Sequence, residues 1–127
     1  MYSQKSNTKS NRKSIPTQAQ TANERAELLE KLSESQKVQA SIIEKIATAT
    51  NELNQYQKDL EVNACRIADA TDEELTSERF YLAIDDERRK LESNQSRLTT
   101  LLARYDLALE KANNAIASTQ KAISENN

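Results

Sequence analysis

Not one of the 127 residues is glycine, and this absence limits the folds open to the chain more than any other feature. Tight turns with a positive φ draw first on glycine, which has no Cβ, so sheets joined by short hairpins are not expected. The abundant residues are instead Ala, Leu, Glu, Lys, Gln and Arg, which lose least free energy on entering a helix. We therefore predict an all-α fold.

An apolar repeat begins at Leu32 and recurs at alternating steps of three and four residues. With Leu32 as a heptad a position, nine of the twelve a and d positions up to residue 70 are apolar, which is typical of a coiled-coil seam. A second repeat follows from Leu75 and becomes rich in alanine. Because large aromatic side chains are scarce, we expect an elongated coiled coil, with a compact three- or four-helix bundle as the alternative. The predicted partner-binding seam consists of Leu32, Ile42, Ile46, Leu53, Tyr56, Leu60, Ile67, Leu91, Leu98, Leu102, Tyr105, Leu109, Ile116 and Ile123.

The two repeats meet in a less regular segment near residues 69–75. Thr71 stands three residues before Glu74, which is the spacing of a capping box and predicts that a new helix begins at about Asp72. The heptad phase nevertheless continues unbroken from one repeat to the next, which favours a single bent helix. A hairpin and a bent rod therefore both stay open.

This segment divides the predicted organisation into a first long helix over 18–70 and a second over 71–125. In the hairpin, Ile67 would face Leu75, and the region of Ile42 would face Leu101. Opposite charges at Asp85 and the two arginines that follow it, Arg88 and Arg89, would stabilise an exposed stretch of the second helix.

Residues 1–17 differ from the rest in charge and composition. They contain Lys5, Lys9, Arg12 and Lys13 with no acid, and they are rich in Ser and Asn, which predicts a disordered basic tail. The rest of the chain is acidic, so we expect no binding of nucleic acid. The tail could supply at most a weak peripheral contact with anionic membranes.

The sequence lacks the residue types on which the common catalytic sites depend. The sequence has no histidine, a single cysteine, Cys65, and no glycine for a phosphate-binding loop. We therefore predict no catalytic residues, no metal site and no cofactor. Cys65 falls at an outer heptad position, where an ordinary helix residue, a redox role and a lipid attachment are all conceivable. The polar seam residues Gln39, Asn63 and Gln95 either fix the register of pairing or mark a loosely packed seam.

The stretch LSESQKVQASIIEKIATATNELNQYQKDL, residues 32–60, resembles the first helix of the snapin/pallidin family, small coiled-coil subunits of lysosome-related organelle biogenesis complexes. The shared features are Ser33 to Gln36, the following Val38-Gln39 pair, and the aliphatic residues Ile42, Ile46 and Leu53. The order of parts over residues 28–117 is also similar, although the family's second helix is strongly basic and this one is mixed. The resemblance implies a subunit of a hetero-oligomeric rod that lies peripherally on endosomal or vacuolar membranes.

The sequence thus predicts a cytoplasmic, non-catalytic subunit that binds other coiled-coil proteins in endosome or lysosome trafficking. A hetero-oligomer is expected, and a homo-oligomer is the alternative. The competing functions are an adaptor in a kinetochore, spindle or transcription complex, and a compact helical-bundle chaperone or cofactor. A SNARE-like fusion helix is disfavoured because Gln39, Arg88 and Gln95 are poorly placed for a central polar layer.

Overall fold

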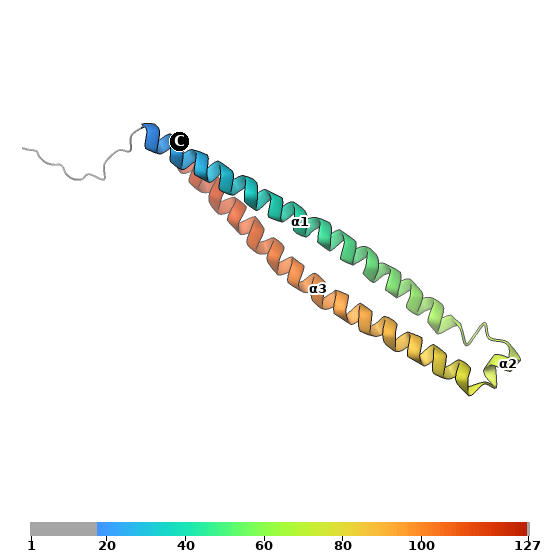
Figure 1. The fold of residues 1–127 in the computed structure, drawn as a ribbon. Helices are drawn as coiled ribbons and strands as arrows, with labels where there is room; N and C mark the ends of the chain where they lie inside the picture. The colour runs from blue at the N-terminus through green and yellow to red at the C-terminus, as the bar shows by residue number, and fades with distance from the viewer. Residues whose placement is uncertain (1–17, 127) are drawn as a thin grey trace, which may run out of the picture. The chain divides into compact units, whose positions relative to one another are not determined.

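A computed structural model describes residues 18–126, and these residues form three helices and no strand. Helix α1 spans Gln18–Cys65, α2 spans Asp72–Leu75, and α3 spans Glu78–Glu125 (Figure 1). The all-α prediction is confirmed over this range, and so is the division into two long helices with a short break. The predicted basic tail, residues 1–17, lies outside the described residues.

The chain divides into two compact units, each built from a segment of α1 and a segment of α3. The larger unit is Val38–Ala112, and the smaller one combines residues 18–37 with residues 113–126. In the larger unit, the side chain of Asn63 donates a hydrogen bond to the main-chain carbonyl of Ile84, and Ala49 and Leu98 line the same cleft. The two helical segments of this unit therefore run antiparallel, and the chain reverses between them.

The reversal is longer than the predicted break, because α1 ends at Cys65 and α3 begins at Glu78. The capping box forms as predicted: the Thr71 hydroxyl accepts from the backbone N–H of Glu74, and the Glu74 carboxylate accepts from the backbone N–H of Thr71. It starts the short helix α2, which stops at a cap on Thr76. A second cap follows, in which the Ser77 hydroxyl accepts from the backbone N–H of Phe80. The chain thus reverses through two caps, with no positive φ among the described residues.

The register of the antiparallel pair differs from the expected one by about one helical turn. Leu101 lines a cleft with Lys45, Thr48 and Ala49, which follow Ile42 in α1. Asn63 contacts Ile84, and the position midway between these two residues in the sequence lies within α2. In the expected hairpin this midpoint lay slightly earlier in the sequence, because the break was expected to be a tight turn without a separate short helix.

Burial in α1 follows the predicted a and d columns, whereas burial in α3 is centred on the d column alone. The buried apolar side chains among residues 21–126 are Ala49, Ile84, Leu98 and Ala112. The last three share the d column of α3, where the next d position, Thr119, is also buried. Half-buried side chains flank this column on both sides. Helix α3 therefore presents a broader face to α1 than a two-column heptad seam would.

Candidate functional site

The predicted seam residues lie largely on the faces that α1 and α3 turn toward each other. In the larger unit, Leu98 is buried and nine others are half-buried: Ile42, Ile46, Leu53, Tyr56, Leu60, Leu91, Leu102, Tyr105 and Leu109. In the smaller unit, Leu32, Ile116 and Ile123 are half-buried. Ile67 differs from the rest: it follows the end of α1 and is 45% exposed. Most of the seam is thus used within the chain, and contact of these residues with another protein remains a prediction.

A polar cluster joins the two helices near the reversal. Asn63 is buried, and its Nδ2 donates to the Ile84 carbonyl at 3.1 Å and to Glu87 Oε1 at 2.7 Å. Arg66 forms an ion pair with the same Glu87 oxygen at 2.7 Å. The hydrogen bond from Asn63 and the nearby Arg66 guanidinium lower the pKa of Glu87, while partial burial opposes this effect. A buried amide with two partners on the opposite segment selects one register, because a slipped pairing would leave it unsatisfied.

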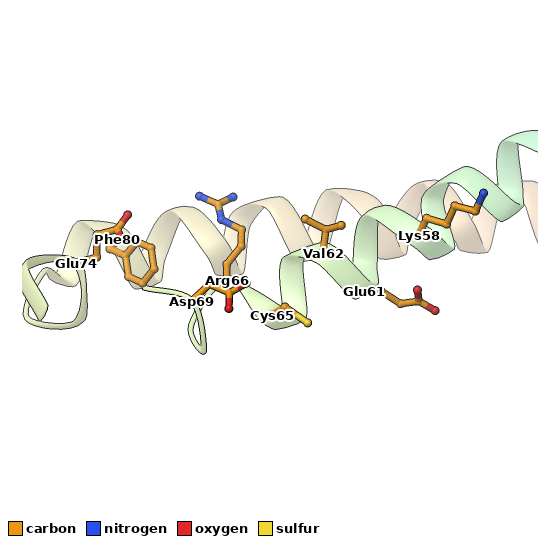
Figure 2. Close-up of a pocket in the computed structure, with 8 residues that line it drawn as sticks. All are labelled: Lys58, Glu61, Val62, Cys65, Arg66, Asp69, Glu74 and Phe80. Carbon is orange, nitrogen blue, oxygen red and sulfur yellow. The ribbon is translucent and has the colours of Figure 1, made fainter. Parts of the chain in front are cut away.

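Two clefts lie beside this cluster. One, of about 510 Å³, is lined by Val62 and Cys65 from the end of α1 and by Phe80 from α3, with charged side chains around them (Figure 2). The other, of about 390 Å³, is lined by Ala64, Ile67, Tyr81 and Ile84 among others. Cys65 is an exposed free thiol at the edge of the first cleft. Both clefts are shallow surface features near the end of the antiparallel pair and combine apolar side chains with charged ones.

Large apolar side chains also remain on the surface, most of them outside the predicted seam. They include Leu29, Val38, Ile43, Val62, Ile67, Leu75, Tyr81, Leu82 and Leu107, each at least 38% exposed. Ile67 and Tyr81 stand in the a column, but the others fall outside the a and d columns, so the heptad pattern did not predict them as seam residues. The signal that could have found them is an apolar residue at an outer heptad position, as at Val62 and Leu107.

The predicted local ion pairs are present on the exposed surface of α3. Asp85 pairs with Arg88, and it also pairs with Arg89 at 3.0 Å. Lys90 pairs with Asp86 at 3.2 Å. These contacts stabilise a charged, solvent-facing stretch of helix by a few tenths of a kcal/mol each.

Within residues 18–126, no group of acidic or cysteine side chains is arranged to hold a metal ion. The same residues include no helix with the length and hydrophobicity needed to cross a lipid bilayer. No family model matches the sequence, and no curated protein or solved structure is significantly similar to the chain. The site with the most specific geometry is therefore the end of the antiparallel pair, with its polar cluster and its exposed apolar side chains.

Proposed function

We propose that this chain is a non-catalytic subunit of a larger helical assembly, and that other coiled-coil proteins bind along its helices. In this proposal the pairing of α1 with α3 is itself coiled-coil packing. The helical fold, the antiparallel pairing and the exposed apolar side chains all favour a protein that works by binding other proteins.

One observation supports this proposal most directly: few large apolar side chains are buried, and many remain exposed. The buried apolar side chains of residues 21–126 are two alanines and only two large residues, Ile84 and Leu98. Val38, Leu82 and Leu107 are all more than half exposed. Two helices can cover each other on one side only, so an apolar residue on another side is covered only by a further helix.

The proposed process is endosome or lysosome trafficking, in a hetero-oligomeric complex at the cytoplasmic side of those membranes. This part of the proposal rests on the resemblance of residues 32–60 to the snapin/pallidin family. It predicts that a tagged chain co-localises with endosomal or vacuolar markers. A diffuse cytoplasmic signal, unchanged when the co-purifying proteins are overproduced, would contradict the trafficking role but not the assembly role.

The assembly role can be tested by purifying the tagged, full-length chain from its native source and identifying its partners after chemical cross-linking. We expect other helical proteins at fixed stoichiometry, and we expect Leu107→Glu to release at least one of them. Ser93→Glu is a matched control, because Ser93 is exposed and lies at the same heptad position two repeats earlier in α3.

The purified chain gives an independent measure of the same proposal. We expect it to unfold over a broad denaturant range and to become more stable when the partners are added. A chain that purifies alone and unfolds sharply as a monomer, with Leu107→Glu behaving as Ser93→Glu does, would contradict the assembly role.

A further inference from the structure

The charged residues of α3 between positions 90 and 111 are separated by sign. All the cations of this stretch stand in one heptad column, the c position, and are exposed: Lys90, Arg97, Arg104 and Lys111. All its acids stand in the e or b columns: Glu92, Asp106 and Glu110. Residues seven apart lie on the same side of a helix, two turns from each other, so the cations form a row with a spacing of about 10.5 Å.

The last three cations of this column have no acidic partner in the described part of the chain. The cations at positions 88–90 each pair with an acid one turn earlier in α3. Arg97, Arg104 and Lys111 form no ion pair within residues 18–126, and the residues three and four positions away from each of them are all uncharged. We call these three residues the basic row. Because no local pair competes for them, their charges are available to carboxylates of another molecule.

A large apolar side chain and a cleft accompany the basic row. Leu107 is 61% exposed and stands three residues after Arg104 and four before Lys111, so the three side chains lie on one side of α3. A cleft of about 380 Å³ lies one turn earlier, and the described residues that line it include no acid: Arg97, Thr100, Leu101 and Arg104.

Helix α1 supplies acids on one side of the basic row only. Glu44 and Glu52 line a separate cleft with Arg97, and neither of them forms an ion pair with it. Thr100 and Leu107 stand in the f column, which lies almost opposite the buried d column of α3. An acidic molecule that approaches from the side of Thr100 and Leu107 therefore meets the cations without meeting these two acids.

We propose that the basic row and Leu107 bind an acidic helix of a partner protein. Acids at every seventh residue of such a helix have the same spacing of about 10.5 Å, so its carboxylates meet all three cations in register. An apolar side chain between these acids covers Leu107. The inference rests on the assembly role proposed above and adds to it the chemistry of one partner surface.

Other anionic molecules fit the basic row less well. An anionic membrane attracts each cation by about 1 kcal/mol, and a helix that lies on it needs a broad apolar face. Leu107 is the one large exposed apolar side chain in residues 90–112. On duplex DNA, the row would neutralise about three phosphates, fewer than the roughly six to ten that proteins with strongly salt-dependent binding contact. A helix with a matching heptad repeat uses the regular spacing of the row, which neither of these surfaces requires.

The complex purified from the native source with the tagged, full-length chain tests the proposal. We expect Arg104→Glu to weaken the binding of one helical partner about tenfold or more, because repulsion replaces attraction, and we expect added salt to weaken the unchanged complex. Arg89→Glu is the matched control, because Arg89 is exposed on the same helix but already pairs with Asp85. It should weaken binding less than about threefold, with the helix content of both variants unchanged by circular dichroism. Ser93→Glu, one turn from Arg97 at the end of the row, should also have a smaller effect than Arg104→Glu.

A carbodiimide, which joins an amine directly to a carboxylate, tests the contact itself. It should join Lys111 to an acid in a helix of that partner, and reversing the charge of this acid should restore binding to the Lys111→Glu chain. Partners that bind Arg104→Glu and Lys111→Glu as tightly as the unchanged chain would overturn the inference and leave the assembly role intact.

Three other outcomes would also overturn the inference. One is a cross-link from Lys111 to a second copy of this chain in place of a partner. Another is binding to phosphatidylserine vesicles or to duplex DNA that Arg104→Glu abolishes while all helical partners stay bound. The third is a chain with no helical partner, which would contradict the assembly role as well.

Discussion

Leu98 is the side chain whose truncation should damage the fold most. It is only 1% exposed and lines the same cleft as Ala49, which is 4% exposed. Leu98→Ala removes three buried carbon atoms, and at about 0.8 kcal/mol for each buried methylene the transfer free energy lost is roughly 2.4 kcal/mol. A residual cavity would add to this loss. The seam has solvent on both sides and can close or hydrate, so we expect a total of about 3 kcal/mol.

The assay is urea unfolding followed by far-ultraviolet circular dichroism, with Leu107→Ala as the control. Leu107 lies on the same helix but is 61% exposed, so the same chemical change should cost less than about 0.5 kcal/mol. A loss of 3 kcal/mol corresponds to a decrease in Tm of roughly 10–20 °C for a chain of this size. Equal losses for the two variants would refute the placement of Leu98 in the interior.

Three further predictions concern the reversal and the polar cluster. The folded-state pKa of Glu87 is lowered, so its carboxylate should stabilise the fold at pH values above its ordinary pKa of 4.5 and lose this contribution as pH falls through the lower folded value. Between pH 7 and pH 3, the Tm of Glu87→Gln should therefore fall by less than the Tm of the unchanged protein. Asn63→Ala removes two hydrogen bonds and should cost about 2 kcal/mol in urea unfolding, while NMR titration shows the pKa of Glu87 rising. Thr71→Ala should cost about 1 kcal/mol by breaking the capping box, whereas Thr76→Ala, at the other end of α2, should cost less; equal losses would contradict the capping role.

The local features of the fold follow from local patterns and could be predicted from the sequence. The capping box needs only Thr71 and Glu74 at the right spacing, and the Asp85 pairs need only the geometry of a single helix. The a and d columns of α1 were also predictable, since burial there recurs at steps of three and four from Leu32 to Asn63.

Features that depend on contacts between distant segments could not be predicted in the same way. The continuous heptad phase favoured one bent helix, yet α1 ends at Cys65 and α3 begins at Glu78, although the buried residues of α3 keep to the predicted d column. The phase match across the break therefore did not indicate a continuous helix. Asn63 was one of three polar seam residues with two possible roles, and only its contacts with Ile84 and Glu87 distinguish them.

The helical reversal also has a consequence for the order in which contacts form during folding. Asn63 and Ile84 are 21 residues apart in sequence, whereas Ala49 and Leu98 are more than twice as far apart. Closing the loop between Ala49 and Leu98 first would cost about 0.7 kcal/mol more free energy, through chain entropy, than closing the loop between Asn63 and Ile84 first. We therefore expect the helix pairing to form first beside α2 and then to extend away from it. Destabilising substitutions near Asn63 should slow folding, whereas those near Ala49 should mainly accelerate unfolding.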